Sequence, residues 1–254
     1  MFQYMNLVPS AFKKIKDGSK TIELRLNDEK RQRINVEDTV VFNCSSTKDI
    51  ITAQVSGLHK FSDFKELYNA LPLEKCGYTV AELDTAHYTD MEQYYTKEQI
   101  KKYGTLGIEL YKVSSICDVK EIITEPDILK LLAPSVFNPT EERLLNRAKE
   151  YQENENANIY AYKENSKYKG IVVFKTQNNS ATILDIAIKP EHQGQGIGSK
   201  LIDFIFNNFN VHSITAETDD DAIGFYKKYG FAVAKTETKF NTKRYICVCD
   251  KPKG

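Results

Sequence analysis

The feature that most constrains the fold is the stretch of residues 193–200, Gln-Gly-Gln-Gly-Ile-Gly-Ser-Lys. The preceding run, residues 183–188, is apolar and rich in β-branched side chains, which predicts a strand that Lys189-Pro190 ends. After the glycines, apolar residues recur at helical spacing as far as Phe209. A helix start leaves about four main-chain amides without internal partners and carries roughly half a positive charge. The sequence therefore predicts a main-chain cradle for an anion after this strand.

The spacing of the glycines excludes two common phosphate loops. A Walker loop needs Gly-Lys-Ser/Thr, and the dinucleotide fingerprint needs Gly-x-Gly-x-x-Gly; neither is present. Gln193, Gly196 and Gly198 instead follow the pattern Gln-x-x-Gly-x-Gly. This pattern resembles the Gln/Arg-x-x-Gly-x-Gly/Ala motif of the GNAT superfamily of acyl-CoA-dependent N-acetyltransferases. A plain glycine-rich turn between a strand and a helix is the alternative.

The resemblance implies acetyl-CoA as the acyl donor. The strand before the loop would hydrogen-bond the pantetheine arm through the backbone of Ile186, Ala187 and Ile188. The loop itself would hold the pyrophosphate, with the residues Gln193, Gly194, Gln195, Gly196, Ile197, Gly198 and Ser199.

A second segment lies downstream, at residues 221–231. It resembles the Ala-x-x-Phe-Tyr-x-x-x-Gly-Phe segment of the same superfamily. The pattern predicts a helix with Ala222, Phe225, Tyr226 and Tyr229 on one face and Gly230 just past its end. The resemblance implies that Tyr226 is the general acid, whereas a core tyrosine on that face is the alternative.

The implied chemistry requires two proton movements, because the amine must attack neutral and the departing thiolate must be protonated. A thiol has a pKa of about 8.5 and a phenol of about 10, so Tyr226 can pass a proton to the thiolate without being ionised at neutral pH. Glu217, near the end of a predicted strand at residues 213–218, is the first candidate base, and Asp185 is the second. Each is also consistent with a solvated carboxylate, and a water chain could replace either.

The remaining residues of this half complete a mixed α/β sheet with flanking helices. Strands are predicted at residues 158–162 and 170–176, and helices at 126–132 and 140–151. A chain of 254 residues is long enough for two ordinary domains. We therefore expect an α+β protein with one domain at residues 1–114 and a second at 115–254.

The N-terminal half predicts several short strands and few helices. Residues 20–26 alternate polar and apolar side chains, and further strands are predicted at 36–42, 50–55 and 103–111. Helices are predicted at 63–69 and 96–102, the second with a capping box formed by Thr96 and Gln99. This set of predicted strands and helices favours a small β-barrel.

Residues 12–25 and 36–42 resemble the ASCH domain, a β-barrel relative of the PUA RNA-binding modules, over residues 5–112. The resemblance implies a cleft for RNA or a nucleotide-like ligand, in which we place Lys20, Glu23 and Arg25. One bacterial branch deacetylates N4-acetylcytidine with a lysine, a threonine three residues later and a distant glutamate. Lys20 matches that lysine, but Glu23 replaces the threonine, which argues against the hydrolase activity. A structural salt bridge between Glu23 and Arg25 is the alternative.

The amino-acid composition limits the classes of partner and cofactor that we expect. The 35 basic and 35 acidic residues balance, which argues against a long sequence-independent grip on phosphates. No Cys-x-x-Cys or His-x-x-x-His pair is present, so no metal is expected, and no long apolar run predicts a membrane span. We expect a cytoplasmic N-acetyltransferase. The alternative is an RNA- or nucleotide-binding protein whose CoA-binding domain is regulatory.

Overall fold

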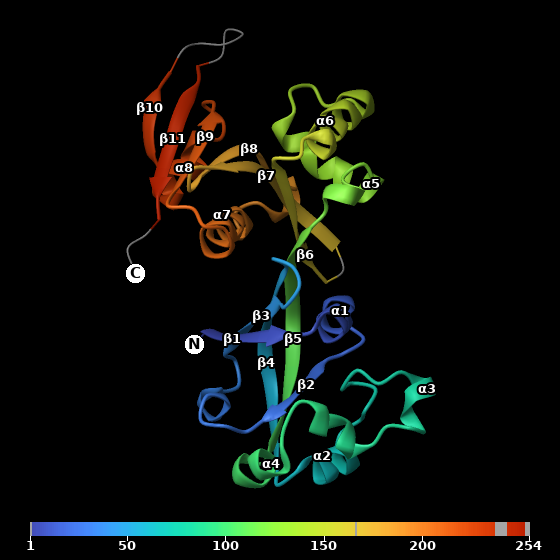
Figure 1. Ribbon diagram of the computed structural model, residues 1–254. Helices are drawn as coiled ribbons and strands as arrows, with labels where there is room; N and C mark the ends of the chain where they lie inside the picture. The colour runs from blue at the N-terminus through green and yellow to red at the C-terminus, as the bar shows by residue number, and fades with distance from the viewer. Residues whose placement is uncertain (1, 166, 237–242, 252–254) are drawn as a thin grey trace. The chain divides into compact units, whose positions relative to one another are not determined.

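The computed structural model describes residues 2–165, 167–236 and 243–251. Its internal contacts divide the chain into two compact units, one up to Ser115 and one from Ile116 onward, with residues 164–166 grouped with the first. Each unit combines a sheet with helices (Figure 1), so the predicted two-domain α+β class is confirmed. None of the helices in these described ranges is long and apolar enough to cross a membrane.

The first unit is built on five strands. β1 runs parallel to β3, β3 is antiparallel to β4, β4 pairs with β5, and β2 pairs antiparallel with β5. The strands are β1 (Phe2–Leu7), β2 (Ile22–Leu26), β3 (Thr39–Cys44), β4 (Ile50–Phe61) and β5 (Thr105–Asp118).

The sheet of the first unit is open, so the closed barrel that the sequence predicts is not confirmed. No pairing between the described residues joins β1 to β2. The carbonyl oxygens of Tyr4 and Asn6 in β1 instead accept hydrogen bonds from Lys30 Nζ at 2.9 Å and Arg25 Nη2 at 2.8 Å. Because long side chains make these bonds in place of strand amides, β1 and β2 stay apart and space for a cavity remains.

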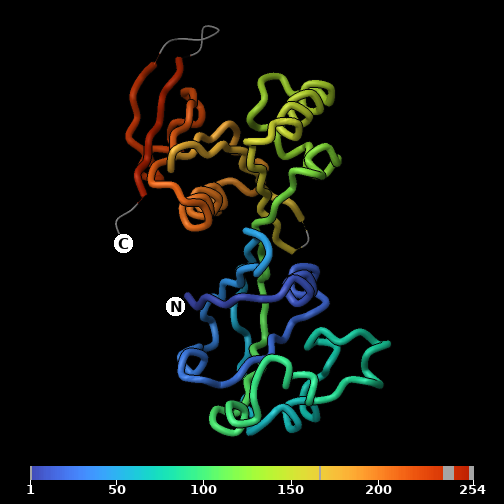
Figure 2. The backbone as a smooth tube through the Cα atoms, in the orientation of Figure 1, coloured from blue at the N-terminus to red at the C-terminus, as the bar shows by residue number. Residues whose placement is uncertain are grey.

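Helices cover the first unit at two places. α1 (Pro9–Asp17) buries Phe12 and Ile15 and ends at Gly18, which has a φ of 85°. A helical segment between β4 and β5 packs beside β2 (Figure 2), where Phe64 and Leu67 join Ile22 and Leu24 in a hydrophobic cluster. This segment comprises α2 (Phe64–Ala70), α3 (Val80–Leu83), the 3₁₀ helix η2 (Tyr88–Gln93) and α4 (Lys97–Tyr103).

Several element boundaries differ from the predictions. The predicted strand at residues 36–42 begins only at Thr39, because Glu37 has a φ of 71° and the Asp38 carboxylate accepts a hydrogen bond from the Asn35 amide, forming a turn. The predicted helix at residues 126–132 is the short α5 (Pro126–Leu129) followed by a 3₁₀ turn, η4 (Lys130–Ser135), because Pro134 cannot continue an α-helix. The predicted capping box is confirmed: Thr96 Oγ1 and Gln99 Oε1 each accept the other residue's amide.

The second unit contains a mixed sheet. Its strand order is β6-β7-β8-β9-β11-β10. β8 is antiparallel to β7 but parallel to β9, and β11 is antiparallel to both β9 and β10. The strands are β6 (Ala157–Glu164), β7 (Lys167–Gln177), β8 (Ser180–Ile188), β9 (Ser213–Thr218), β10 (Ala232–Lys235) and β11 (Tyr245–Asp250).

Helices cover both faces of this sheet. α5 and α6 (Glu141–Glu153) pack on the face that presents Ile159 and Val173. α7 (Ile197–Asn208) packs on the opposite face, where Phe204 meets Tyr160 at a ring-centroid distance of 4.7 Å. Neighbouring residues of one strand point to opposite faces, so the buried run at residues 170–174 of β7 is covered on both sides. α8 (Ile223–Tyr229) follows β9.

Candidate functional site

The loop after β8 and the first turn of α7 contain a run of main-chain amides without hydrogen-bond partners among the described residues. A 3₁₀ turn, η5 (Pro190–His192), follows β8, and α7 begins at Ile197. Gly194 and Gly196 have φ values of 74° and 77°, and nothing lies within 4 Å of the position that a Cβ would take at either residue. Over the described residues, none of the amides of residues 194–199 makes a hydrogen bond. These donors sit at the positive end of α7, where the helix dipole favours an anion.

Gly198 serves the packing of two helices. A Cβ at Gly198 would lie 2.7 Å from Cε2 of Phe225, so only glycine lets this ring approach the first turn of α7. Phe225 belongs to α8, the helix predicted from the second segment of the sequence. The two sequence motifs are therefore in contact, because the aromatic ring of the second motif packs against the glycine of the first.

β8 and β9 separate beside this loop. Their described pairing runs only from Ser180 to Ile183 of β8. The register with β7 then shifts, because Val173 pairs with Asp185 and Phe174 with Ile183, which leaves Leu184 as an extra residue. Residues 186–188 pair with β7 alone in the described sheet, so no strand covers their other edge, on which the Ile188 carbonyl accepts the Gln193 side-chain amide at 3.2 Å.

Tyr226 is a buried phenol on α8. Its ring packs edge-to-face against Phe225 and Phe231, each at a centroid distance of 5.1 Å, and the residue is 4% exposed. Burial raises the pKa of Tyr226 well above its ordinary value, and the nearby Cys247 and Asp185 raise it further. The phenol therefore keeps its proton at neutral pH.

The two candidate bases have different surroundings. Glu217 is exposed at the end of β9, and its carboxylate forms an ion pair with Arg244 Nε at 3.1 Å. Asp185 is buried, and its carboxylate accepts hydrogen bonds from Arg147 Nε at 2.7 Å, Arg147 Nη2 at 3.0 Å and the Tyr151 hydroxyl at 2.7 Å. Asp185 is therefore held as a structural anion, whereas Glu217 remains accessible to solvent.

The Asp185 network escaped the sequence analysis. Arg147 and Tyr151 lie on α6, which is 38 and 34 residues away from Asp185 along the chain. From the sequence alone, the charged and hydroxyl groups of this helix predict an ordinary solvent-exposed face. Only the packing of α6 on β8 brings them to the carboxylate.

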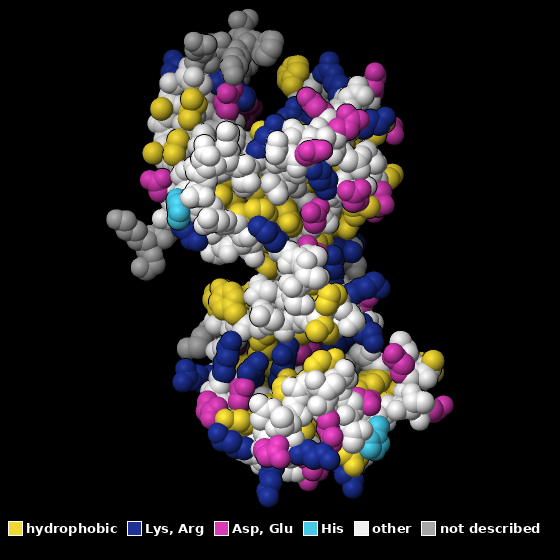
Figure 3. All heavy atoms as spheres, in the orientation of Figure 1, with side chains coloured by type: hydrophobic (Ala, Val, Ile, Leu, Met, Phe, Trp, Pro, Cys, Tyr) yellow, Lys and Arg dark blue, Asp and Glu magenta, His cyan; other side chains and the backbone are white. Residues whose placement is uncertain are grey.

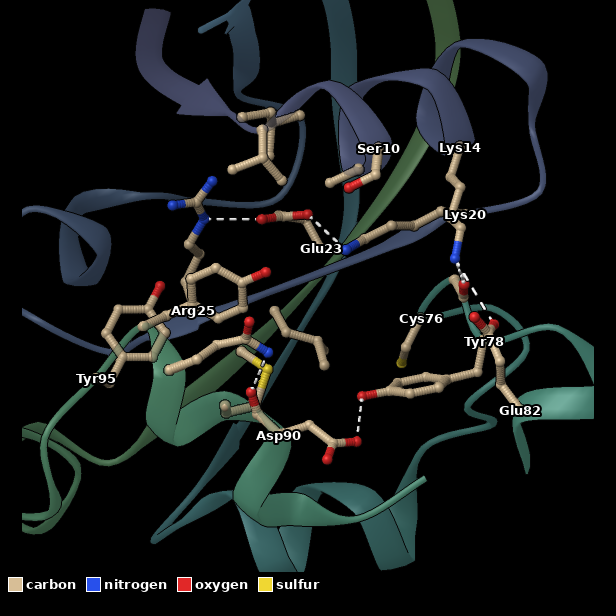
Figure 4. A pocket seen from close by; sticks show the side chains of 18 of the residues that line it. Ser10, Lys14, Lys20, Glu23, Arg25, Cys76, Tyr78, Glu82, Asp90 and Tyr95 are labelled. Carbon is tan, nitrogen blue, oxygen red and sulfur yellow. Dashed lines mark hydrogen bonds and ion pairs between the residues drawn. The ribbon is translucent and has the colours of Figure 1, made fainter. Parts of the chain in front are cut away.

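The first unit holds a cavity of about 290 Å³ between α1, β2 and the helical segment before β5. Lys20, which precedes β2, has its Nζ atom 2.9 Å from one Glu23 carboxylate oxygen, and Arg25 Nε on β2 lies 2.8 Å from the other (Figure 4). Glu23 is 4% exposed. The three predicted cleft residues are thus brought together on one wall, and the salt bridge weighed as their alternative role is also formed.

The opposite wall of this cavity comes from the helical segment between β4 and β5. Gly77, with a φ of 101°, lets the Lys20 side chain pack within 3.0 Å of the position that a Cβ would take. The Tyr78 hydroxyl donates to Asp90 at 3.2 Å, and Cys76 lines the floor, where burial raises the pKa of its thiol to about 11. In neither unit do three or more described His, Cys, Asp or Glu side chains gather to hold a metal ion.

Comparison with protein families matches both halves of the chain. Residues 5–114 match the family model of the ASCH domain, and residues 155–233 match that of the acetyltransferase (GNAT) domain. The chain joins an ASCH domain to a GNAT acetyltransferase domain.

Individual relatives cover parts of the chain. An uncharacterized N-acetyltransferase, ycf52, of Pyropia yezoensis is 35% identical over 71 residues, which are 26% of this chain and 41% of that protein. The crystal structure of hypothetical protein PH0355 is 32% identical, with a TM-score of 0.37, over 43% of this chain and 97% of that one. The N-acetyltransferase PseH of Campylobacter jejuni, in complex with acetyl coenzyme A, is 15% identical with a TM-score of 0.42, over 55% of this chain and 99% of that one.

We expect Gly198→Ala to destabilise the GNAT domain by about 1–3 kcal/mol, because a methyl group is forced into a filled site against Phe225. Gly224→Ala is the matched control, since nothing lies within 4 Å of the Cβ position at Gly224 and alanine favours the helix. Urea denaturation of both variants tests this contact. Equal stability of the two variants would show that the Phe225 ring yields without cost.

We expect Glu23→Gln to destabilise the ASCH domain by about 3–5 kcal/mol, because the change leaves two nearly buried cations, Lys20 and Arg25, without their shared anion. Glu109→Gln is the control, since Glu109 is half-exposed and faces only His59 at 3.4 Å. It should change stability by no more than about 0.5 kcal/mol. Urea denaturation measures both variants. Equal free energies of unfolding for Glu23→Gln and Glu109→Gln would refute a structural role for the Glu23 carboxylate.

Proposed function

We propose that this chain is a GNAT-family N-acetyltransferase that moves an acetyl group from acetyl-CoA to an amine. The unpaired amides of residues 194–199, at the start of α7 and beside the separated strands β8 and β9, carry this proposal. They supply hydrogen-bond donors and positive potential where the diphosphate of coenzyme A requires both. The match of residues 155–233 to the GNAT domain supports the same assignment.

Each predicted site residue then has a role. The uncovered edge of β8 at Ile186, Ala187 and Ile188 would pair with the amide groups of pantetheine. Gln193 would order the loop, because its side-chain amide donates to the Ile188 carbonyl at 3.2 Å. The amides from Gly194 to Ser199 would bind the diphosphate.

The chemistry uses groups on α8 and β9. The amine nitrogen attacks the thioester carbonyl carbon, the carbon–sulfur bond breaks, and the sulfur takes a proton from the Tyr226 phenol. Glu217, or water beside it, takes the proton that the amine loses. Asp185 is not assigned as the base, because Arg147 and Tyr151 occupy its carboxylate.

Ligand-induced stabilisation tests the donor site. Acetyl-CoA at one hundred times its dissociation constant should stabilise the full chain by about 2.7 kcal/mol, visible as a raised melting temperature. ATP and NAD should give no comparable shift. Release of free CoA with a panel of amines then tests transfer. Equal shifts in melting temperature with acetyl-CoA, ATP and NAD would show that the site binds phosphates in general.

For the ASCH domain, which we place at residues 1–114 with a PUA-like organisation, we propose binding of RNA or a nucleotide-like ligand. The cavity beside β2 supports this second function, because its polar wall of Lys20, Glu23 and Arg25 faces tyrosine side chains suited to stacking on bases. Figure 3 shows lysine and arginine side chains gathered on the face around β1 and the 3₁₀ helix η1 (Arg31–Arg33). If RNA binding is the primary role, the GNAT domain would serve as its CoA-dependent regulator.

Salt-dependent binding tests the ASCH proposal. Affinity for tRNA, short RNA or nucleosides at low salt should fall with Lys20→Ala and Arg25→Ala. Lys65→Ala, which removes an exposed cation of α2 outside the cavity, should leave it unchanged. Absence of binding to all of these ligands would make the ASCH domain a scaffold.

A further inference from the structure

A second cavity, of about 640 Å³, lies along α6 in the GNAT domain. It is open to solvent and is lined mainly by one face of that helix. Arg143 and Arg147, one helical turn apart, supply its cationic part together with Lys149, and Glu150 and Glu153 supply its acidic part. No sequence motif pointed to this cavity.

Arg147 presents a fixed donor edge to the cavity. Its Nε and Nη2 atoms are bound by Asp185, and its guanidinium lies 5.3 Å from the centre of the Tyr151 ring. The Nη1 atom has no acceptor among the residues that the structure describes. The side chain is 38% exposed, so this edge can reach a ligand from solvent.

Arg143 adds an immobilised positive charge. Its Nη1 atom donates to the carbonyl oxygens of Phe137 and Asn138, at 3.1 Å and 3.3 Å. No carboxylate forms an ion pair with Arg143 within the described ranges. Carbonyl oxygens orient the guanidinium without neutralising it, so its charge remains available to an anion.

The cavity is connected to the proposed reaction centre through Asp185. This residue follows the extra residue Leu184, at the point where β8 parts from β9. Its carboxylate binds Arg147 Nε at 2.7 Å, and the residues that follow it, 186–188, form the edge of β8 along which the pantetheine arm would lie. A small ligand held at Arg147 would therefore have the thioester end of the site within reach.

We propose that the acceptor is an amino acid-type amine, whose carboxylate is bound by Arg143 and Arg147 while its amine faces the thioester. This inference rests on the proposed acetyl transfer. A guanidinium fork suits a carboxylate in geometry and charge. Glu150 and Glu153 offset two of the three cations that line the cavity, which favours a singly charged carboxylate over a multiply charged anion such as a phosphate.

Steady-state kinetics of the full chain test the proposal. The acceptors compared are amino acids whose amine lies one to four carbons from the carboxylate. Each amino acid is tested together with the corresponding carboxamide. We expect a kcat/KM at least tenfold higher for the best amino acid than for its carboxamide. Arg143→Gln should remove that preference by raising the KM of the amino acid more than the KM of its carboxamide. Lys130→Gln, an exposed cation on η4 outside the cavity, is the control.

Arg147 needs a variant that protects the fold, because Arg147→Gln alone leaves the Asp185 carboxylate buried without its partner. The double variant Arg147→Gln with Asp185→Asn keeps the network neutral and should also lose the preference. Equal kcat/KM for amino acids and their carboxamides in the unmodified chain would overturn the proposal, as would a preference that survives Arg143→Gln.

A binding measurement separates this inference from the transfer reaction itself. The CoA-saturated chain should melt at a higher temperature with the N-acetyl amino acid than with its N-acetyl carboxamide, and Arg143→Gln should abolish the difference. If transfer occurs but this difference in melting temperature is missing, the proposed carboxylate site is refuted and the proposed acetyl transfer is not. If acetyl-CoA neither shifts the melting temperature nor acetylates any amine, the proposed function fails first.

Discussion

Gly196→Val should lower the affinity for acetyl-CoA at least a hundredfold, which corresponds to about 2.7 kcal/mol. Gly196 is the N-cap of α7 and has a φ of 77°, a conformation that costs a β-branched residue at least about 1–2 kcal/mol. The added side chain would also occupy the open space at the mouth of the loop, where nothing now lies within 4 Å of the Cβ position. Both effects act on the amides that would bind the diphosphate.

Gly18→Val separates strain from binding. Gly18 also has a left-handed φ, 85°, and also has nothing within 4 Å of its Cβ position, but it ends α1 in the ASCH domain. This variant should lose stability and keep its affinity for acetyl-CoA. Calorimetric titration of both variants measures the contrast. If Gly196→Val binds acetyl-CoA as tightly as Gly18→Val does, the loop amides do not form the cradle.

Tyr226→Phe should lower kcat by about 10²–10⁴-fold and change the affinity for acetyl-CoA by less than about twofold, because general acid catalysis contributes that much and the buried ring is preserved. The packing against Phe225 and Phe231 involves the ring alone, so the fold should persist. Tyr229→Phe is the matched control on the same helix, where the lost hydroxyl only donates to Asp203. A kcat for Tyr226→Phe equal to that of Tyr229→Phe would remove the phenol from the mechanism.

The pH profile gives an independent test of Tyr226. Its pKa lies above the ordinary phenol value of about 10, so the folded protein keeps this proton to higher pH than the free side chain does. The rate should therefore show no alkaline loss from this group below about pH 10. A loss centred near pH 8 that disappears in Tyr226→Phe would mean that the phenol ionises far more easily than its burial implies.

Local signals predicted many of the elements. The strand predicted at residues 213–218 is β9, and the helix predicted from the second motif is α8, which ends with Gly230 in the left-handed conformation. These predictions succeed because side-chain periodicity and glycine at a helix end act over a few neighbouring residues. β1 and α1 were missed, although Pro9 at the start of α1 and the spacing of Phe12 and Ile15 were available signals.

The sequence alone determined the glycine pattern of the loop, the order of the two domains and the placement of Glu23 and Arg25 on one strand, because each depends on neighbours along the chain. Tertiary structure alone decided that Asp185 is held by Arg147 and Tyr151, that Phe225 requires the glycine at 198, and that β1 and β2 leave the sheet open. Each of these outcomes joins residues from different elements. A carboxylate becomes a base or a buried anchor according to the side chains that packing brings to it, and the local sequence does not contain that information.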